Sequence, residues 1–297
     1  MKKVIIIGSS NVDIIARFHK NYQKHDSNPS DIRISWGGVG RNICENLARL
    51  NTKPSFMTVL GDDFFSQELK KSFKKLQIDY RSSKIVKGQS SIYLALINPN
   101  GLLEVASSST GLIEMLSQKD ILLQKDYLNE FDYIVLDTNL SEEALTCVFD
   151  VIKKPIIVDA TSAQKAIKLK PFLNKIALLK CNQYEALALT NNYSIEMQVK
   201  ILNELGIKEV IITQGASDIY YNDKKKIIKK EVAKVESVVD ETGAGDAFTS
   251  GIVYGKIKGY SLLKSIMIAE RLAQETLKVV GAINQLTPDE WHKILIK

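Results

Sequence analysis

The sequence predicts an α/β domain in which helices cover both faces of a mainly parallel central sheet. Short apolar, β-branched runs typical of buried strands occur at residues 4–7, 133–136, 156–158 and 210–213. Segments with the helical spacing of apolar residues alternate with them, at residues 39–50, 184–191 and 199–205. This alternation favours three layers, and sheets of this kind bind ligands at the carboxyl ends of their strands.

The composition is that of an ordinary globular protein. Of the 297 residues, 45% are hydrophobic and 25% are charged, and apolar residues run through the whole length, which excludes disorder of the bulk. The apolar run at residues 4–7 is far too short for a signal peptide or a spanning helix. Neither the three cysteines nor the three histidines form a zinc, redox or disulfide pattern. We expect a cytoplasmic protein without a membrane partner.

The net charge of +6 is modest for this length, and one dense basic run contributes to it. This run covers residues 224–226, with Lys229 and Lys230, and follows the turn signal Asn222-Asp223 between two short β-like runs. It is open to interpretation as a nucleic-acid patch or as a solvated hairpin tip. Because no aromatic residues or recognition motif accompany it, the hairpin tip is favoured and we expect no nucleic-acid partner.

Two stretches interrupt the alternation of strands and helices. Residues 14–36 are polar and contain the alternating apolar residues Ile32, Ile34 and Trp36. Residues 88–107 have the pattern of a hairpin with its turn at residues 98–101. We predict that both stretches form a small β lid over the site, inserted into one domain that spans residues 1–297.

The most informative segment is Asp-Glu-Thr-Gly-Ala-Gly-Asp-Ala-Phe at residues 240–248. We expect a strand over residues 235–239 before it, a helix after it, and Thr242 as the cap of that helix. The first amides of a helix have no partner within it, and the residues that leave space above them are Gly243, Ala244 and Gly245. The segment therefore predicts a site where a phosphate meets bare amides and the positive end of a helix dipole.

Asp246 lies in the same first turn, where its charge would repel a phosphate. A carboxylate at this position makes sense as the base that takes a proton from an attacking hydroxyl group. Neither GxxxxGK[ST] nor GxGxxG occurs in the sequence, which makes a P-loop or a Rossmann dinucleotide site an unlikely basis for phosphate binding.

The segment at residues 240–248 resembles the second signature of the ribokinase-like (PfkB) carbohydrate kinases. Gly37-Gly38-Val39-Gly40-Arg41-Asn42 resembles the first signature, although Asn51 stands where the family usually has glycine. The resemblance extends from Gly8 to about Asn284. It implies a ribokinase-like three-layer α/β/α sandwich with a small β lid, ATP and Mg²⁺ as cofactors, and a homodimer formed through the lid.

The resemblance also implies roles for individual residues. The catalytic group comprises Asp246 with the amides of Gly243, Ala244 and Gly245. The acceptor-binding residues are Asn11, Asp13, Gly37, Gly38, Arg41, Asn42, Ser91, Tyr93 and Lys165. The nucleotide-binding residues are Asn182, Glu185, Thr213, Gly215, Thr242, Ala282 and Asn284. Glu185 would hold Mg²⁺ through water, and Asp240 lies where many relatives bind a monovalent cation such as K⁺.

Considered alone, several of these residues have structural alternatives. Asp13 is equally a turn residue, Asn182 and Glu185 are equally a helix cap and an exposed carboxylate, and Asn42 is equally a residue at a helix start. Charged residues such as Arg41 and Lys165 more often lie on the surface of helices.

Three stretches are most similar to the pseudouridine kinases of the family. They are residues 37–50, in which Arg41, Glu45 and Asn46 are distinctive, residues 91–95, and residues 159–166 leading into 179–186. The chain departs from that pattern at residues 107–111, which read Ser-Ser-Ser-Thr-Gly where those kinases carry Asn-Asp-Met, and at Cys181, where proline is common. The hydroxyl groups of the serines and the threonine in residues 107–111 can still form hydrogen bonds with the edge of a uracil base.

We therefore expect an ATP-dependent kinase that phosphorylates the 5′-hydroxyl of a nucleoside, with pseudouridine as the leading substrate. A ribokinase or another nucleoside or sugar kinase of the family is the nearest alternative. A non-catalytic nucleoside or sugar sensor on a kinase fold is an alternative of another class. An RNA-binding module that uses the +6 charge is a third, less favoured one.

Overall fold

The computed structural model describes residues 2–223 and 226–296. Its main sheet has eight strands in the order β14-β13-β12-β11-β10-β9-β1-β4. The strands are β1 (Val4–Ile7), β4 (Ser55–Met57), β9 (Tyr133–Asp137), β10 (Ile156–Asp159), β11 (Leu178–Asn182), β12 (Glu209–Thr213), β13 (Ile219–Asp223) and β14 (Lys226–Lys230). In this spatial order all strands from β12 to β4 run parallel to one another. Strands β13 and β14 complete the sheet as an antiparallel hairpin.

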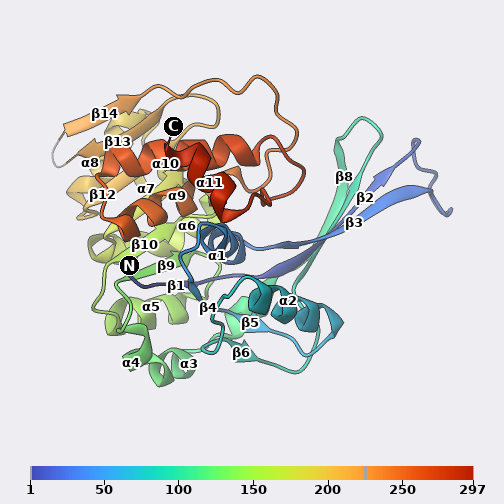
Figure 1. The fold of residues 1–297 in the computed structure, drawn as a ribbon, viewed down its shortest axis with the longest axis horizontal. Coiled ribbons are helices and arrows are strands. Elements are labelled where there is room, and N and C mark those ends of the chain that lie inside the picture. Colours follow the sequence, from blue (N-terminus) through green and yellow to red (C-terminus); the bar gives the residue numbers. More distant parts are fainter. Residues whose placement is uncertain (1, 224–225, 297) are drawn as a thin grey trace.

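Helices cover both faces of this sheet, which confirms the predicted three-layer α/β/α fold (Figure 1). On one face pack α3 (Gln118–Leu123), α4 (Lys125–Leu128), α5 (Glu142–Val151), α6 (Ala163–Ala166), α7 (Gln183–Thr190) and α8 (Ile195–Glu204), with the 3₁₀ segments η1 (Gly111–Met115) and η2 (Ile167–Lys175). On the other face pack α1 (Val39–Arg49), α2 (Phe64–Lys75), α9 (Ala244–Lys258) and α10 (Leu262–Thr276). The last helix, α11 (Pro288–Ile296), packs Trp291 near α10.

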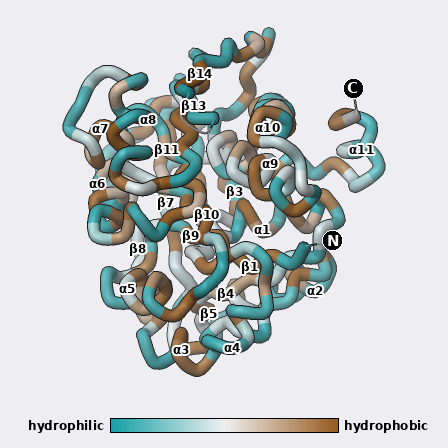
Figure 2. Tube along the Cα trace, turned by 90° about the vertical axis from the view of Figure 1, so that its left-hand side faces the viewer, coloured by the Kyte–Doolittle hydropathy of each residue, from teal (hydrophilic) through white to brown (hydrophobic). Residues whose placement is uncertain are grey.

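Successive residues of a strand contribute to opposite layers of the core. In β1, Ile5 and Ile7 face the α5 side, whereas Val4 and Ile6 face the α1 side. A strand buried on both faces needs apolar residues at every position, which explains the continuous apolar runs in the sequence. Hydrophobic stretches accordingly run through the middle of the body, with hydrophilic turns at its rim (Figure 2).

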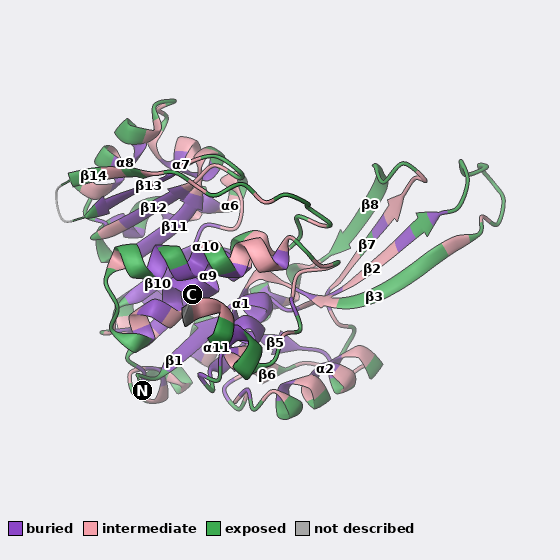
Figure 3. Cartoon of the chain, turned by 45° about the horizontal axis from the view of Figure 1, so that its top comes forward, coloured by how far each residue is buried: buried purple, intermediate pink, exposed green. Residues whose placement is uncertain are grey.

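A second, four-stranded sheet extends away from the body (Figures 1 and 3). Its order is β3-β2-β7-β8, with β2 (Asn11–Phe18), β3 (Ser30–Gly37), β7 (Ile92–Ile97) and β8 (Leu103–Ser109). The stretches predicted as a lid supply these strands. At the base of the second sheet, β5 (Val59–Leu60) and β6 (Lys84–Ile85) form a separate two-stranded sheet.

Two local predictions concern the segment before α9 and the basic run near β14. The strand expected over residues 235–239 is wrong, because this segment is an irregular loop between β14 and α9. Its amide at Val239 donates to the carbonyl of Leu277 on α10, at 2.8 Å, so the segment follows a helix end instead of a sheet edge. Of the basic run, Lys226, Lys229 and Lys230 lie on β14, and residues 224 and 225 fall outside the described part of the chain.

None of the helices in residues 2–223 and 226–296 is long and apolar enough to cross a membrane.

Candidate active site

The candidate site lies where the carboxyl ends of β9, β10 and β11 meet the first turn of α9. Three charged residues stand side by side at this edge, because Asp137 pairs in register with Asp159, and Asp159 with Lys180. In each strand the residue two positions earlier packs against the α1 and α9 layer, so these three side chains point to the same layer. The topology thus gathers charge at the start of α9.

The start of α9 has open backbone amides. Gly243 caps the helix with a left-handed φ of 76°, and no side chain accepts a hydrogen bond from the first turn. A Cβ atom at Gly243 would also lie 2.5 Å from Ala282, so this position requires glycine. The expected cap by Thr242 is wrong, because the left-handed turn at Gly243 takes the capping position and the Thr242 backbone instead donates to Asp240 Oδ1, at 2.9 Å. The Ala244 amide donates to the Glu241 carbonyl, at 3.3 Å, whereas the described backbone hydrogen bonds include none from the amides of Gly245 and Asp246, which remain available to an anion.

Asp246 lies in that first turn and accepts a hydrogen bond from Asn42 Nδ2, at 2.7 Å. Burial raises the pKa of Asp246 to about 7, and Asp159 adds to the increase, while Asn42 and Lys180 oppose it. A carboxyl group with this pKa is about half ionised near neutral pH. It can therefore accept a proton from an alcohol and release it again.

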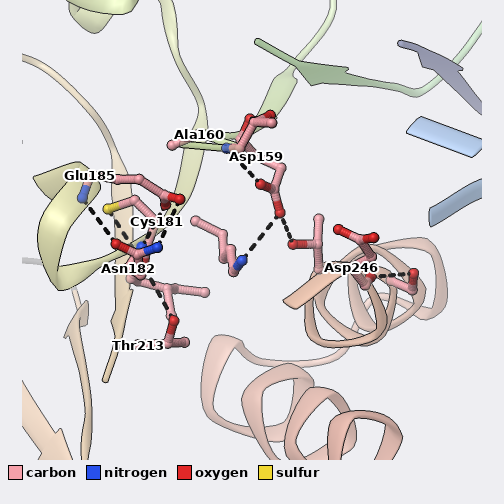
Figure 4. Close-up of polar contacts among 12 residues, drawn as sticks. Asp159, Ala160, Cys181, Asn182, Glu185, Thr213 and Asp246 are labelled. Carbon is pink, nitrogen blue, oxygen red and sulfur yellow. Dashed lines mark hydrogen bonds and ion pairs between the residues drawn. The ribbon is translucent and has the colours of Figure 1, made fainter. Parts of the chain in front are cut away.

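Lys180 and Asp159 form a buried ion pair near Asp246, with Nζ and Oδ2 separated by 3.3 Å (Figure 4). The same Asp159 oxygen accepts a hydrogen bond from Thr249 on α9, at 2.5 Å. A Cβ atom placed on Gly245 would lie 3.2 Å from Lys180 Nζ, which puts the ammonium group at the open amides of α9. Lys180 is thus placed to meet an anion bound there. No role for Lys180 was predicted from the sequence, although a lysine at the end of an apolar strand run was a usable signal.

A cleft of about 620 Å³ opens from this point between the ends of β11 and β12 and the helices α9 and α10. Its lining includes five of the residues that the sequence predicted for phosphate or nucleotide binding: Asn182, Thr213, Gly215, Ala244 and Gly245. Further in, apolar side chains such as Val238, Phe248 and Leu277 provide surfaces for a flat ring. The volume and the mixed lining suit a nucleotide with its phosphates at α9.

Asn182 and Glu185 cap α7 together. Asn182 Oδ1 accepts from the amides of Tyr184 and Glu185, and Glu185 Oε2 accepts from the amide of Asn182, at 2.7 Å. The structural alternative from the sequence is confirmed for the helix cap and wrong for the exposed carboxylate, because Glu185 is buried, and the binding of nucleotide or Mg²⁺ by this pair stays a prediction. Burial raises the pKa of Glu185, against the opposing effect of Lys180.

The described residues contain no group of three or more His, Cys, Asp or Glu side chains that could hold a metal by themselves. Mg²⁺ that is bound mainly by phosphates and water needs only one or two protein carboxylates, so the residues present fit such an ion. Glu185, near the phosphate end of the cleft, is the residue that would contact such water.

Three residues predicted at the nucleotide lie in supporting loops and do not line the cleft: Thr242, Ala282 and Asn284. Asp240 joins these loops, because its Oδ1 accepts from the Thr242 amide and its Oδ2 from the Gly281 amide, each at 2.9 Å. Asn284 bonds the Glu275 carbonyl on α10, at 2.8 Å. The binding of K⁺ near Asp240 stays a prediction.

The second sheet brings the predicted acceptor residues together. Strand β2 lies between β3 and β7, so that Asn11 pairs with Gly37, and Asp13 with Tyr93. A Cβ atom on Gly37 would overlap the Asp13 carboxylate, so the absence of a side chain there makes room for it. Burial raises the pKa of Asp13, and a hydrogen bond from Asn11 and the charge of Arg41 oppose this. Asn11, Asp13 and Tyr93 thus form a polar face toward the body.

The remaining acceptor candidates lie around the loop after β1. The Ser91 carbonyl accepts from the amide of Val12, at 2.8 Å, and Gly38 caps α1. Lys165 Nζ donates to Asn139 Oδ1, and Asn139 Nδ2 donates to Ser9 Oγ, at 3.0 Å. Lys165 therefore reaches this loop through Asn139.

Asp137 holds the same loop and was not singled out in the sequence. Its Oδ2 accepts from the amides of Ser9 and Gly40, at 2.7 and 2.9 Å. It thereby fixes the loop after β1 to the start of α1, from which Asn42 reaches Asp246. The signal in the sequence was an aspartate that ends an apolar strand run, a pattern shared with Asp159.

Comparison with known proteins decides the family. Residues 1–289 match the model of the pfkB family carbohydrate kinases. The chain belongs to this family. It is 30% identical over 274 residues to pseudouridine kinase of Escherichia coli K12, covering 90% of this chain and 88% of the relative. It is 31% identical over 290 residues to an uncharacterized sugar kinase of the same organism, covering 95% and 80%.

Among solved structures, ribokinase from Thermotoga maritima superposes with a TM-score of 0.88 at 21% identity, with both chains covered completely. This likeness confirms the ribokinase-like fold. The chain is accordingly a PfkB-type sugar or nucleoside kinase, a family that uses ATP as phosphoryl donor. In such a kinase the cleft at α9 is suited to the nucleotide, and the polar face of β2, β3 and β7 to the acceptor.

Proposed function

We propose that this PfkB kinase transfers the terminal phosphoryl group of ATP to the 5′-hydroxyl of a nucleoside, and that pseudouridine is its substrate. The observation that carries the reaction is the position of Asp246, which lies in the open first turn of α9 and is bonded to Asn42 from the acceptor side. One carboxylate thus borders both the phosphate site and the acceptor site.

The proposed reaction uses Asp246 as base. Asp13, Asn11 and Asn42 hold the ribosyl hydroxyls, so that the primary hydroxyl points at Asp246. As the hydroxyl oxygen bonds to the terminal phosphorus, its proton passes to Asp246, and the bond from that phosphorus to the bridging oxygen of ATP breaks. The amides of Gly243, Ala244 and Gly245, with Lys180, stabilise the negative charge on the transferred group.

Mg²⁺ bound to the phosphates supplies charge neutralisation. The protein contributes to it through Glu185, whose burial beside Lys180 and whose hydrogen bonds to Asn182 fix its position. Closure of the second sheet over the acceptor would exclude water, which otherwise competes with the alcohol for the phosphoryl group.

The choice of pseudouridine rests on the relative that is 30% identical and on the stretches around Arg41, Ser91 and Lys165 that resemble pseudouridine kinases. A panel of acceptors tests it, with ADP release measured for pseudouridine, uridine, ribose, adenosine and fructose at fixed ATP. We expect the largest kcat/KM with pseudouridine. A preference for ribose would overturn the substrate, and no ADP release with any acceptor would favour the sensor.

We propose further that two chains associate through the second sheet. Its face opposite Asp13 carries apolar side chains that are exposed: Ile32, Ile34, Leu94 and Val105. Exposed apolar surface of this extent favours burial against a second copy. Light scattering behind a sizing column should give the mass of a dimer, and Ile34→Glu should yield monomers. A monomeric wild-type protein at micromolar concentration would refute this proposal.

A further inference from the structure

Arg41 is the distinctive residue of the first signature. It is buried, and its guanidinium group is occupied by contacts within the protein. Only 4% of it is exposed. Its Nη1 donates to the Trp36 carbonyl, at 2.8 Å, and to Asn42 Oδ1, at 2.9 Å. Its Nη2 pairs with Oε2 of Glu45 one turn later on α1. Both terminal nitrogens are therefore engaged within the protein.

These contacts form a continuous chain that ends on the base. Glu45 pairs with Arg41, Arg41 donates to the oxygen of the Asn42 amide, and the nitrogen of that amide donates to Asp246 Oδ2. We propose that Arg41 is a positioning residue, which fixes the orientation of the Asn42 amide and thereby the placement and ionisation of the Asp246 carboxylate. The proposal rests on the proposed function only in taking Asp246 as the base.

The physical reason lies in the two ends of an asparagine amide. The oxygen only accepts hydrogen bonds and the nitrogen only donates them, although the two ends have nearly the same shape. A guanidinium group only donates, so Arg41 selects the oxygen end and leaves the nitrogen facing Asp246. The reversed amide would set an oxygen against the carboxylate and an NH₂ group against the guanidinium, so that both contacts become repulsive.

Other charged groups also act on Asp246, and they come from the strands of the main sheet. Asp159 on β10 and Asp137 on β9 raise its pKa, whereas Lys180 on β11 lowers it. On the α1 side, Asp246 interacts with Arg41, which also lies near Asp13. Neither Arg41→Met nor Arg49→Met removes one of these three side chains or the contact of Asp137 with Gly40, so a change in the titration of Asp246 that differs between the two variants reports the contacts of Arg41.

Arg49 provides a matched control. It pairs with the other oxygen of the same Glu45, at 2.7 Å, from the same helix, and it makes no contact with Asn42 in the described hydrogen bonds. Arg41→Met and Arg49→Met therefore each remove one cation from Glu45, but only the first releases the amide. Arg41→Gln, which retains a donor for the Trp36 carbonyl, replaces Arg41→Met if that variant does not fold.

The first experiment measures kcat and KM against pH. We expect Arg41→Met to move the acid limb of the kcat profile up by about one pH unit, which lowers kcat at pH 7 about fivefold, because the ionised fraction falls from about a half to about a tenth. KM for the acceptor should stay within about twofold, and Arg49→Met should keep the wild-type profile. A KM that rises tenfold with kcat retained would overturn the proposal in favour of a substrate contact.

The second experiment needs no activity. Carbon NMR of carboxyl-labelled aspartate, with Asp246 assigned from the Asp246→Asn variant, follows the titration of Asp246 directly. Its pKa should rise by about one unit in Arg41→Met and stay unchanged in Arg49→Met. Equal values in wild type and both variants would refute the positioning role. If the wild type phosphorylates no acceptor, the proposed function fails, and this titration still decides the role of Arg41.

A double-mutant cycle separates action through Asn42 from a direct effect. If Arg41 acts through the amide, Arg41→Met should lower kcat several-fold in the wild type but by less than about twofold in Asn42→Leu. Additive losses would show that Arg41 acts independently of Asn42, and the positioning role would be refuted.

Discussion

Replacing Asp246 by asparagine should abolish phosphoryl transfer and at the same time stabilise the protein. Asparagine fills the same volume and can still accept the hydrogen bond from Asn42, so folding and ligand binding should be retained. It cannot take the proton of the acceptor hydroxyl, and general-base catalysis is worth about 10²- to 10⁴-fold. We expect kcat to fall by at least that factor, with KM values for ATP and acceptor within about threefold.

The gain in stability follows from the raised pKa of the carboxyl group. A pKa of about 7 in the folded protein, against an ordinary value of 3.8, means that the folded state resists ionisation of Asp246. Three pKa units correspond to about 4 kcal/mol for a group shielded from water. Because Asp246 is only partly buried, as its exposed surface shows, about 2 kcal/mol is the appropriate expectation.

The difference in stability between the wild type and the Asp246→Asn variant depends on pH. Well below the ordinary pKa of 3.8 the carboxyl is protonated in both the folded and the unfolded chain, so it costs no stability. As pH rises from 4 to 7, the unfolded chain ionises first, and the wild type loses stability that the asparagine variant keeps. The variant should therefore melt about 3–6 °C higher than the wild type at pH 7.5 and at the same temperature near pH 4.

The assay is differential scanning fluorimetry of both proteins across pH 4–8, together with ADP release at saturating ATP and acceptor. An acceptor-independent control, the binding of an ATP analogue, shows whether the cleft is intact. Equal melting temperatures at pH 7.5 would refute the raised pKa, and activity within tenfold of the wild type would refute Asp246 as the base.

Three further substitutions probe the neighbouring groups. Lys180→Met leaves Asp159 unpaired, so it should destabilise the fold by about 3 kcal/mol in urea unfolding and lower kcat about 100-fold; kcat within threefold would contradict its place at the phosphate site. Gly37→Ala should displace the Asp13 carboxylate and raise the acceptor KM at least tenfold without changing the ATP KM, measured by initial rates; equal effects on both would point to a general distortion. Glu185→Gln should raise the Mg²⁺ concentration for half-maximal rate severalfold, and an unchanged Mg²⁺ dependence would remove Glu185 from the metal's surroundings.

The layers of the fold were predictable because buried parallel strands need apolar residues on both faces. The run at residues 4–7 forms β1 with the expected bounds, and the runs at 133–136 and 210–213 needed only one further residue. The same rule failed at residues 235–239, because this apolar segment pairs in no strand and its Val235 and Val238 line the cleft at α9. Sequence spacing alone does not distinguish a residue that pairs in a sheet from one that lines a cleft.

The candidate site was predictable only where local sequence builds it. The segment around Gly243 makes its own turn and places Asp246 beside it, so one stretch of chain contains the signal. Lys180 and Asp159 become neighbours only when β10 and β11 pair in register, and their partner Thr249 comes from a helix far along the chain. Arg41 was expected at the acceptor or on the surface, because its burial depends on how α1 packs against the sheet.

Two independent parts of the fold thus determine the ionisation of one carboxylate. From the sheet, the row Asp137, Asp159 and Lys180 sets a charge environment that parallel register imposes, since a shift by one residue would turn all three side chains to the opposite layer. From α1, the Asn42 amide provides the single direct hydrogen bond described for the Asp246 carboxylate. The row of two aspartates and one lysine carries a net negative charge, which by itself disfavours the ionised form of Asp246. The hydrogen bond from Asn42 on α1 favours the ionised form of Asp246. A pKa of Asp246 near neutral pH therefore requires both the row on the sheet and the amide on α1.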